Sequence, residues 1–324
     1  MLAYLFGAAI AAADPSGLLV VANKAENSVT VIDLASGRQI TRMPTGTGPH
    51  EVAVSPDGRW AVATNYGDRT PGNTLAVFDL PGRRVEKTID LGEYRRPHGA
   101  VFLPDGRLMV TSETSQALVF VDVAAGVVLG SAPTNARTSH LAVVPADGRH
   151  AYSANITDGS VTEVDLATAR PTRSLPVATQ TEGVAVTPDG GTVWLASRNQ
   201  GIVVVVDIAS WRAVDTLGGM RLPYRVNAAP DGSTMVVSDP EADSLLVFDA
   251  RTRKRLGAVG TGAGSQPVGG AVSRDGRYAY IALQARDEVV EVDLVRFEIT
   301  RRLPVGSRPD GVAVWSAGID SGRR

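Results

Sequence analysis

A unit of about 42 residues returns along the whole chain, and this repeat constrains the fold more than any other feature. Its first landmark is an Asp-Gly pair, with glycines at Gly58, Gly106, Gly148, Gly190, Gly232 and Gly276. Its second landmark is an apolar run that ends in aspartate, at Asp33, Asp79, Asp122, Asp165, Asp207, Asp249 and Asp293. The seven aspartates indicate seven repeated structural units, each with a turn at this position.

Each unit is built from short runs typical of β-strands. In one unit, VAVS precedes the turn Pro56-Asp57-Gly58, and WAVATN, NTLAVFDL and EKTIDLG follow it. Proline fixes its own φ and glycine accepts a positive φ, so Pro-Asp-Gly favours a tight turn. Four β-rich runs in one unit match a propeller blade, and no helical periodicity extends over a useful length. The repeat therefore predicts an all-β, seven-bladed β-propeller of four-stranded antiparallel blades.

The two ends of the chain are predicted to close the ring. The run RPDGVAVW at 308–315 is a first strand with only a polar tail after it, whereas the run at 18–23 lacks a first strand before it. Pairing these two runs removes an exposed sheet edge. Residues 7–15 compete for the same place but lack the proline and the turn. We therefore expect one propeller domain over residues 14–316, with a polar tail at 317–324.

The strand that follows each turn carries a recurrent tetrad. Its copies are VVAN (20–23), VATN (62–65), VTSE (110–113), YSAN (152–155), WLAS (194–197), VVSD (236–239) and YIAL (280–283). Over residues 17–316 the chain resembles the YVTN-repeat propellers, a family that includes YncE-like proteins and the cytochrome d1-like propeller domain. The resemblance implies the seven-bladed fold and a protein that is often exported. It does not imply a function, because unrelated functions share one fold.

The N-terminus favours export. Residues 2–13 are apolar, and Ala11, Ala12 and Ala13 precede Asp14 like a cleavage site, so residues 1–13 are predicted to be a signal peptide and the protein to be periplasmic or extracellular. The positively charged segment that normally precedes the apolar part of a signal peptide is missing, because the first basic residue is Lys24. If this leader is not a signal peptide, the protein is expected to be cytoplasmic. Twelve apolar residues are too few to span a bilayer.

Composition removes several classes of function. The chain has no cysteine, which excludes disulfides, thiolate metal sites and Cys-attached haem. Its 32 basic and 34 acidic residues give a net charge of −2, so the sequence does not indicate a nucleic-acid partner. We expect a monomer without a membrane span.

A ring of seven residues is predicted at one mouth of the central channel. The position seven residues before each turn aspartate precedes the innermost strand of a blade, and innermost strands start at one mouth. These residues, with their counterpart in the closing strand, are His50, His98, His140, Glu182, Tyr224, Val268 and Asp310. Three of the four histidines in the chain fall on this ring.

More polar residues are expected around the same mouth. The ends of the second strands return there, with Asn23, Asn65, Glu113, Asn155, Ser197, Asp239 and Leu283, and nearby positions add Glu51, Tyr66, Arg95, Arg96, Arg198 and Arg225. Polar residues concentrate on one side of the ring, and a polar crescent at a concave mouth is a typical ligand site.

Three kinds of chemistry suit this crescent. His50, His98, His140 and Glu182 could bind one divalent transition metal such as Zn, Fe, Cu or Mn. The same four residues with Glu113 could catalyse by general acid and base. A small anionic molecule or peptide could be bound by Glu51, Asn65, Tyr66, Arg96, Asn155, Arg198, Tyr224, Arg225 and Asp310.

Each of these functional interpretations has a structural alternative. A histidine at this position could simply hydrogen-bond a neighbouring loop, the asparagines are good turn formers, and Arg95 and Arg96 could be solvated. Two functions remain open: an exported binding propeller, or a metal- or acid/base-dependent lactonase, lyase or hydrolase. An enzyme predicts a deep pocket where the three imidazoles converge on one point, whereas a binding protein predicts a wide mouth with splayed imidazoles.

Overall fold

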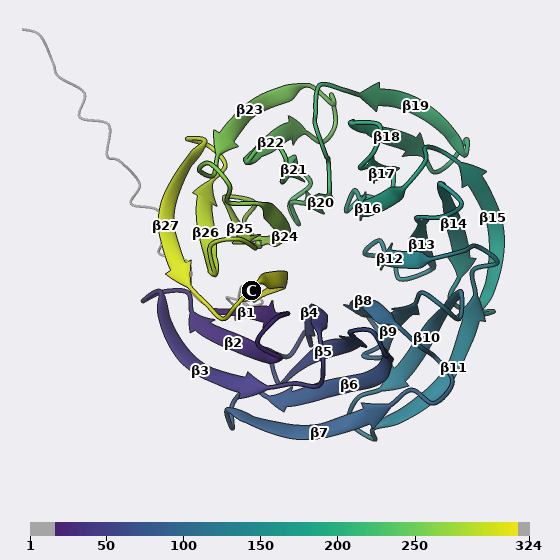
Figure 1. The fold of residues 1–324 in the computed structure, drawn as a ribbon. Helices are drawn as coiled ribbons and strands as arrows, with labels where there is room; N and C mark the ends of the chain where they lie inside the picture. The colour runs from purple at the N-terminus through teal and green to yellow at the C-terminus, as the bar shows by residue number, and fades with distance from the viewer. Residues whose placement is uncertain (1–16, 317–324) are drawn as a thin grey trace, which may run out of the picture.

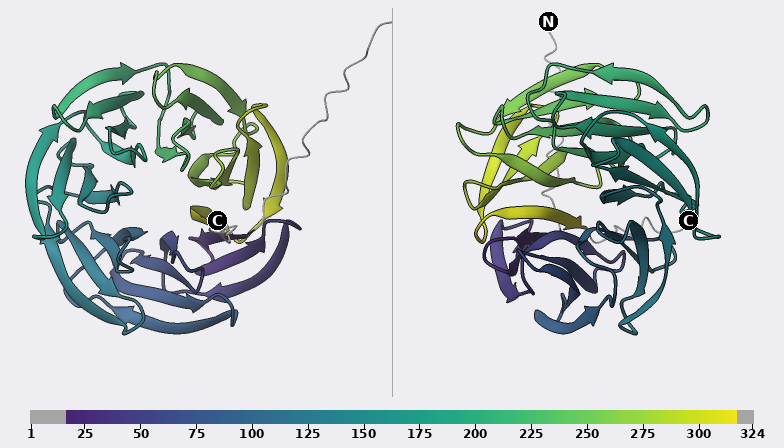
Figure 2. Two further views of the ribbon diagram at one scale, coloured as in Figure 1. Left: turned by 180° about the vertical axis from the view of Figure 1, so that it is seen from behind. Right: turned by 45° about the vertical axis from the view of Figure 1, so that its right-hand side comes forward.

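The computed structural model describes residues 17–316, which form seven four-stranded antiparallel sheets around a central axis. Figure 1 looks down this axis, and Figure 2 shows the ring from behind and at an oblique angle. The described residues contain only strands, turns and loops, and no helix long and apolar enough to cross a membrane. The predicted all-β propeller with seven blades is confirmed. The predicted signal peptide (1–13) and polar tail (317–324) lie outside the described residues.

The sheets follow one another along the chain, each with its strands in spatial order. The closing sheet holds β28 (Pro309–Trp315), β1 (Leu18–Asn23), β2 (Ser28–Asp33) and β3 (Arg38–Pro44). The next three hold β4 (Pro49–Val54), β5 (Trp60–Gly67), β6 (Pro71–Asp79) and β7 (Arg84–Asp90); β8 (Pro97–Phe102), β9 (Leu108–Ser112), β10 (Ala117–Asp122) and β11 (Val127–Pro133); and β12 (Ser139–Val143), β13 (His150–Asn155), β14 (Ser160–Asp165) and β15 (Arg170–Pro176). The last three hold β16 (Thr181–Val186), β17 (Thr192–Ser197), β18 (Ile202–Asp207) and β19 (Arg212–Leu217); β20 (Arg225–Ala228), β21 (Thr234–Asp239), β22 (Ser244–Asp249) and β23 (Arg255–Gly260); and β24 (Pro267–Val272), β25 (Tyr278–Leu283), β26 (Glu288–Asp293) and β27 (Glu298–Pro304).

The ring is closed by pairing the last strand with the first. β28 runs antiparallel to β1, with Leu18 opposite Trp315 and Val21 opposite Val312. The Trp315 indole also donates a hydrogen bond to the Pro56 carbonyl on the neighbouring sheet, at 3.2 Å. β28 thereby becomes the innermost strand of a sheet whose other strands come from the start of the chain, as predicted (Figure 1).

The hydrophobic core lies between neighbouring blades. The two middle strands of each sheet are buried on both faces, so they read as continuous apolar runs such as IVVVVD in β18. One cluster joins Trp194 and Val205 of one sheet to Met235 and Phe248 of the next. The outermost strands alternate or expose most of their residues. Each blade can therefore bury its faces only against its neighbours.

The recurrent aspartate after the third strand forms turns. Asp33 accepts hydrogen bonds from the backbone N–H and the hydroxyl of Ser36, at 2.8 and 2.6 Å, and Asp207 does the same with Ser210, at 2.7 and 2.6 Å. This arrangement is the expected structural role for aspartate at the start of a turn. Turn formation therefore explains why the residue recurs.

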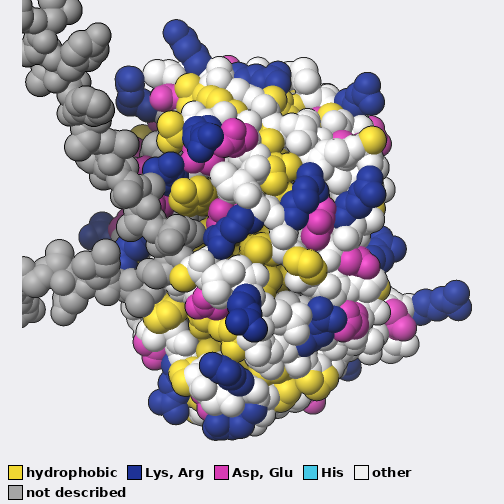
Figure 3. Space-filling model, turned by 90° about the vertical axis from the view of Figure 1, so that its left-hand side faces the viewer, with side chains coloured by type: hydrophobic (Ala, Val, Ile, Leu, Met, Phe, Trp, Pro, Cys, Tyr) yellow, Lys and Arg dark blue, Asp and Glu magenta, His cyan; other side chains and the backbone are white. Residues whose placement is uncertain are grey.

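The outer wall carries charges of both signs. Figure 3 shows Lys and Arg side chains interspersed with Asp and Glu side chains on the face that it displays, without a continuous basic surface there. Nucleic-acid binding would be expected to use a continuous basic surface. That face therefore gives no support for such a partner.

Candidate functional site at the channel mouth

A β-bulge turns most of the ring residues toward the channel axis. The innermost strand of a blade pairs regularly with the second strand except near its start, where the register shifts between Pro49 and Val52, and between Pro97 and Ala100. Similar shifts flank His140, Glu182, Val268 and Asp310. A bulge inserts a residue and redirects its side chain. The predicted ring therefore has a local structural cause that recurs from blade to blade.

The three ring histidines lie in a row. His50 Nδ1 is 2.9 Å from His98 Nε2, and the ring centroids of His98 and His140 are 3.8 Å apart. The imidazoles therefore contact one another in sequence and do not converge on one point. His98 is 1% exposed, and its Nδ1 has no hydrogen-bond partner among the described residues.

Burial keeps two of these histidines neutral. It lowers the pKa of His50 to about 2, and the nearby positive charges of Lys24 and Arg225 act in the same direction. It also lowers the pKa of His98 far below its usual range, and His140 and His50 add to this shift. Both imidazoles are therefore available as neutral donors of a lone pair at physiological pH.

His140 behaves differently because carboxylates lie on both sides of it. Its Nδ1 is 2.5 Å from Glu113 Oε1, and its Nε2 is 3.4 Å from Glu182 Oε1. Burial alone would lower its pKa, but its hydrogen bonds with Glu113 and Glu182 outweigh burial and raise it. Glu182 has a pKa lowered to about 2, because His140 and the arginines Arg225 and Arg198 overcome the effect of burial.

A second set of residues at the mouth comes from one position beyond the second strand. β9 ends at Ser112, which pairs with Pro97 just as Asn65 pairs with Pro49. Glu113 is therefore the counterpart of Tyr66, not of Asn65 as the sequence alignment of the units suggested. We call this set the exit residues; those that contact the site are Lys24, Tyr66, Glu113 and Arg198.

The exit residues contact one another and the ring residues. The Tyr66 hydroxyl donates to Glu113 Oε2 at 2.6 Å, and Arg198 Nη1 is 2.8 Å from Glu182 Oε2. Lys24 Nζ is 3.7 Å from Asp310 Oδ2. Lys24 was missed as a site residue from the sequence, although it follows VVAN as Tyr66 follows VATN. An alignment of the residues that directly follow the tetrads could have identified Lys24 as a site residue.

Arginines and tyrosines complete the mouth. The Arg96 guanidinium lies 4.6 Å above the Tyr66 ring, and that of Arg225 lies 4.7 Å from the Tyr224 ring. Arg225 also contacts His140 Nε2 at 3.3 Å and pairs with Glu51 Oε1 at 2.9 Å. The structure therefore brings together all the predicted site residues except two.

The two exceptions are Asn65 and Asn155. The Asn65 side chain accepts from the Gly46 N–H at 3.0 Å and donates to Thr74 at 2.9 Å. Asn155 is fully buried and donates to Ser160 and Thr162, at 3.1 and 3.0 Å. Both side-chain amides form hydrogen bonds with strands or loops next to them in the fold. These contacts fit the turn-forming alternative that the sequence left open for the asparagines.

Three buried residues form a group that could hold a metal ion. One ligand atom from each of His98, Glu113 and His140 lies within 4.8 Å of the others. Two of these residues were predicted as metal ligands, whereas Glu113 was predicted as a catalytic residue and Glu182 as the carboxylate ligand. The metal prediction stays a prediction.

Comparisons with known proteins give the fold but no family. No model of a protein family matches the chain, and no curated protein matches it. Among solved structures, a chain of Kuenenia stuttgartiensis hydrazine synthase is similar with a TM-score of 0.75 and 18% identity, over 90% of this chain and 99% of that one. A protein of unknown function from Desulfotomaculum acetoxidans DSM 771 is similar with a TM-score of 0.76 and 12% identity, over 94% of this chain and 100% of that one. These similarities support the seven-bladed propeller fold.

Proposed function

We propose that this chain is an exported binding propeller of the YVTN type that holds one divalent transition-metal ion at the channel mouth. The observation that carries the proposal is the buried group of His98, Glu113 and His140, whose ligand atoms lie within 4.8 Å of one another. Two imidazoles and a carboxylate suit Zn and other first-row transition metals. The export part rests on the apolar leader and on the YVTN resemblance of the tetrads.

The hydrogen bonds around the group fit this assignment provided that the metal replaces the proton between His140 and Glu113. His98 has a buried Nδ1 without a partner, while its Nε2 contacts His50, so Nδ1 is the nitrogen free for a metal. His140 has its Nδ1 beside Glu113 and its Nε2 near Glu182. A carboxylate at the second nitrogen of a metal-binding histidine fixes the ring and its tautomer. His50 and Glu182 therefore act as supporting residues around the three ligands.

The rim above this group suits an anionic molecule. Lys24 pairs with Asp310 and Arg198 with Glu182 at this mouth, and neither of these two cations nor Arg96 is fully buried. Arg96 has no carboxylate partner among the described residues; it lies over the Tyr66 ring. A small carboxylate or phosphate at the mouth would meet these cations and could coordinate the metal directly.

Metal analysis of protein purified without chelator tests the proposal. We expect about one equivalent of metal in the wild type and a loss of most of it in His98→Ala and in Glu113→Gln. The matched control is His150→Ala, because His150 begins β13 and lies away from this group. The proposal fails if the wild type binds no metal after incubation with Zn, Fe, Cu or Mn salts. It also fails if His150→Ala loses as much metal as His98→Ala.

An enzymatic function is the second candidate. The hydrogen-bonded series Tyr66, Glu113 and His140 favours it, because such a series can hold and transfer a proton beside a bound ligand. A lactonase, lyase or hydrolase would then act on an anionic substrate at the mouth. Turnover of a lactone panel by the metal-loaded protein, abolished in Glu113→Gln but kept in His150→Ala, would favour this candidate over binding alone.

A further inference from the structure

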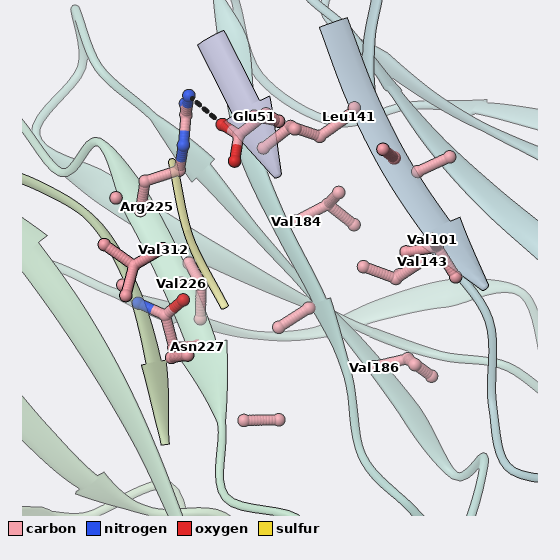
Figure 4. A pocket seen from close by; sticks show the side chains of 18 of the residues that line it. Glu51, Val101, Leu141, Val143, Val184, Val186, Arg225, Val226, Asn227 and Val312 are labelled. Carbon is pink, nitrogen blue, oxygen red and sulfur yellow. Dashed lines mark hydrogen bonds and ion pairs between the residues drawn. The ribbon is translucent and has the colours of Figure 1, made fainter. Parts of the chain in front are cut away.

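The central channel contains a cavity that lies next to the candidate site and shares Glu51 and Arg225 with it. Its volume is about 410 Å³, and it is lined by residues from the innermost strands of all seven blades (Figure 4). None of the seven ring residues lines it; the lining starts one position further along the strands, at residues such as Glu51, Gly99 and Leu141. The cavity therefore occupies the part of the channel beyond the ring.

An ion pair across the channel separates the two spaces. Glu51 lies on β4 and Arg225 at the start of β20, and their side chains meet at 2.9 Å. These strands belong to sheets that are not neighbours in the ring. Arg225 is 4% exposed, and its Nη1 already contacts His140 and Glu182. The pair therefore forms a polar end to the cavity on the side of the ring.

One oxygen of this pair is available to a ligand. Oε1 of Glu51 accepts the hydrogen bond from Arg225, and the contacts of the described residues include no hydrogen bond to Oε2. Figure 4 shows this second oxygen on the side of the surrounding valines, while the guanidinium of Arg225 points away from them. While Glu51 is ionised, this oxygen is an acceptor at the polar end of the cavity; burial raises the pKa of Glu51, and the Arg225 guanidinium acts in the opposite direction. Two buried donors also line the cavity without a partner among the described residues, Arg225 Nε and Asn227 Nδ2.

The remaining walls are almost entirely aliphatic. Apart from Glu51, Arg225 and Asn227, the lining consists of valine, alanine, leucine and glycine. Figure 4 places Val101, Val143, Val184 and Val186 on one side and Val226 and Val312 on the other. Ligand pockets typically have such an apolar lining, a few placed polar groups and a volume of roughly 300–1,000 Å³.

We propose that this cavity binds a linear aliphatic molecule whose terminal group donates hydrogen bonds to Glu51, as a primary ammonium or hydroxyl group does. The tail would replace water along the valine walls, and burial of its methylene groups would supply most of the binding free energy. A carboxylate terminus placed at Glu51 would be repelled by that residue in its ionised form. The proposal does not require a metal ion at the channel mouth.

Calorimetric titration of the full chain with three eight-carbon probes tests the proposal. We expect octylamine and 1-octanol to bind at one site, with octylamine at least about tenfold tighter than octanoate, because a hydrogen bond to a charged group contributes roughly 1.5–3 kcal/mol. Equal or tighter binding of octanoate would overturn the choice of terminal group. If no probe binds at concentrations below its own aggregation limit, the cavity is not a site for aliphatic molecules.

Two variants locate the binding. Glu51→Gln keeps the shape of the side chain but, with its amide oxygen on Arg225, presents an NH₂ group to the cavity; we expect the preference for octylamine over octanoate to disappear. Val101→Phe fills part of the cavity and should abolish binding of every probe, with Val143→Phe as a second test if Val101→Phe does not fold. Unchanged binding in folded Val101→Phe or Val143→Phe protein would place the probes elsewhere. Metal content should stay at the wild-type value in Val101→Phe, which separates this test from the test of the metal site.

Discussion

At the scale of single residues, the candidate site depends on where a bulge places a side chain. A strand without a bulge would direct residue 98 toward a neighbouring blade, because side chains alternate between the two faces of a sheet. The register shift between Pro97 and Ala100 changes this direction. The carbonyl of His98 then accepts a hydrogen bond from Thr64 on the neighbouring blade, at 2.9 Å, and that of His140 accepts one from Thr111 at 2.7 Å. Both the backbone and the imidazole of His98 and of His140 are therefore held by adjacent blades.

Asn155 tests the division between structural and site residues. Asn155→Ala should lower the free energy of unfolding by about 2–3 kcal/mol, because it leaves buried hydroxyls such as Ser160 and Thr162 without a partner. Urea unfolding of wild type and variant measures this loss, and metal content measured alongside should not change. A variant that kept its stability but lost metal would show that Asn155 belongs to the site.

Asp165 tests the role of the turn aspartates through pH. Hydrogen bonds from the Thr168 backbone and hydroxyl lower the pKa of Asp165 below its usual range. A carboxyl whose pKa is lower in the folded state stabilises the fold above the unfolded value near 3.9, and this contribution is lost as the pH falls through the folded pKa. We expect Asp165→Asn to be less stable than wild type at pH 7 and this difference to shrink by pH 2–3. Urea midpoints at several pH values measure it, and a difference that grows toward low pH would contradict the argument.

Some site residues could be predicted from the sequence because the repeat fixes their position. His50, His98 and His140 occur at one distance before the turn, and a ring fold brings equal positions to one mouth. The partners of Arg225 could not be predicted, since Glu51 is 174 residues away and the pairing depends on the width of the channel. Glu113 was assigned to the wrong position because β9 ends one residue earlier than the tetrad pattern indicated.

At the scale of strands, small residues allow the innermost strands to approach one another. The position after the ring residue is glycine in four blades: Gly99, Gly183, Gly269 and Gly311. A Cβ atom on Gly311 would lie 2.6 Å from the backbone oxygen of His50 on β4, and one on Gly269 would overlap the backbone oxygen of Asp310 on β28. Backbone atoms cannot move away as a flexible side chain can. Glycine is therefore needed for space at these contacts.

Gly269→Ala tests this close approach of two strands. We expect it to destabilise the protein by about 1–3 kcal/mol, as overpacking does. The matched control is Gly99→Ala, where a Cβ atom would be 3.2 Å from its nearest neighbours, the Leu141 Cα and side chain, so the cost should be smaller. Thermal and urea unfolding of both variants would measure the difference. Equal stability of both variants would mean that the innermost strands can separate without cost.

The strands themselves were predictable because turns interrupt the chain at regular places. Pro56-Asp57-Gly58 separates β4 from β5, and every sheet except the closing one has a counterpart of this turn. The bulges were not predictable from the pattern of apolar residues, since a single inserted residue changes direction without changing composition. β20 departs from the other innermost strands: it has four residues, begins at Arg225 and pairs with β21 without a register shift.

At the scale of the whole molecule, stability depends on closing the circle. Each blade buries its two apolar faces against its two neighbours. A ring with one missing strand therefore exposes a sheet edge as well as apolar faces. β28 supplies the strand that covers β1, and it also supplies Asp310 to the ring and Val312 to the cavity wall. Closure and both proposed sites are therefore linked through one strand.

Removal of residues 309–324 tests this dependence. The shortened chain should associate or unfold at a much lower urea concentration, because β1 would be left as an unpaired edge. A synthetic peptide of residues 305–316 should restore the monomer and its unfolding midpoint by pairing in the register of Leu18 with Trp315. The control peptide carries Gly311→Val, whose side chain would clash with the His50 carbonyl and the Glu51 backbone, so it should fail to restore either property. Size-exclusion chromatography and urea unfolding measure both effects, and a shortened chain that stays monomeric with an unchanged midpoint would show that the other sheets hold the ring without β28.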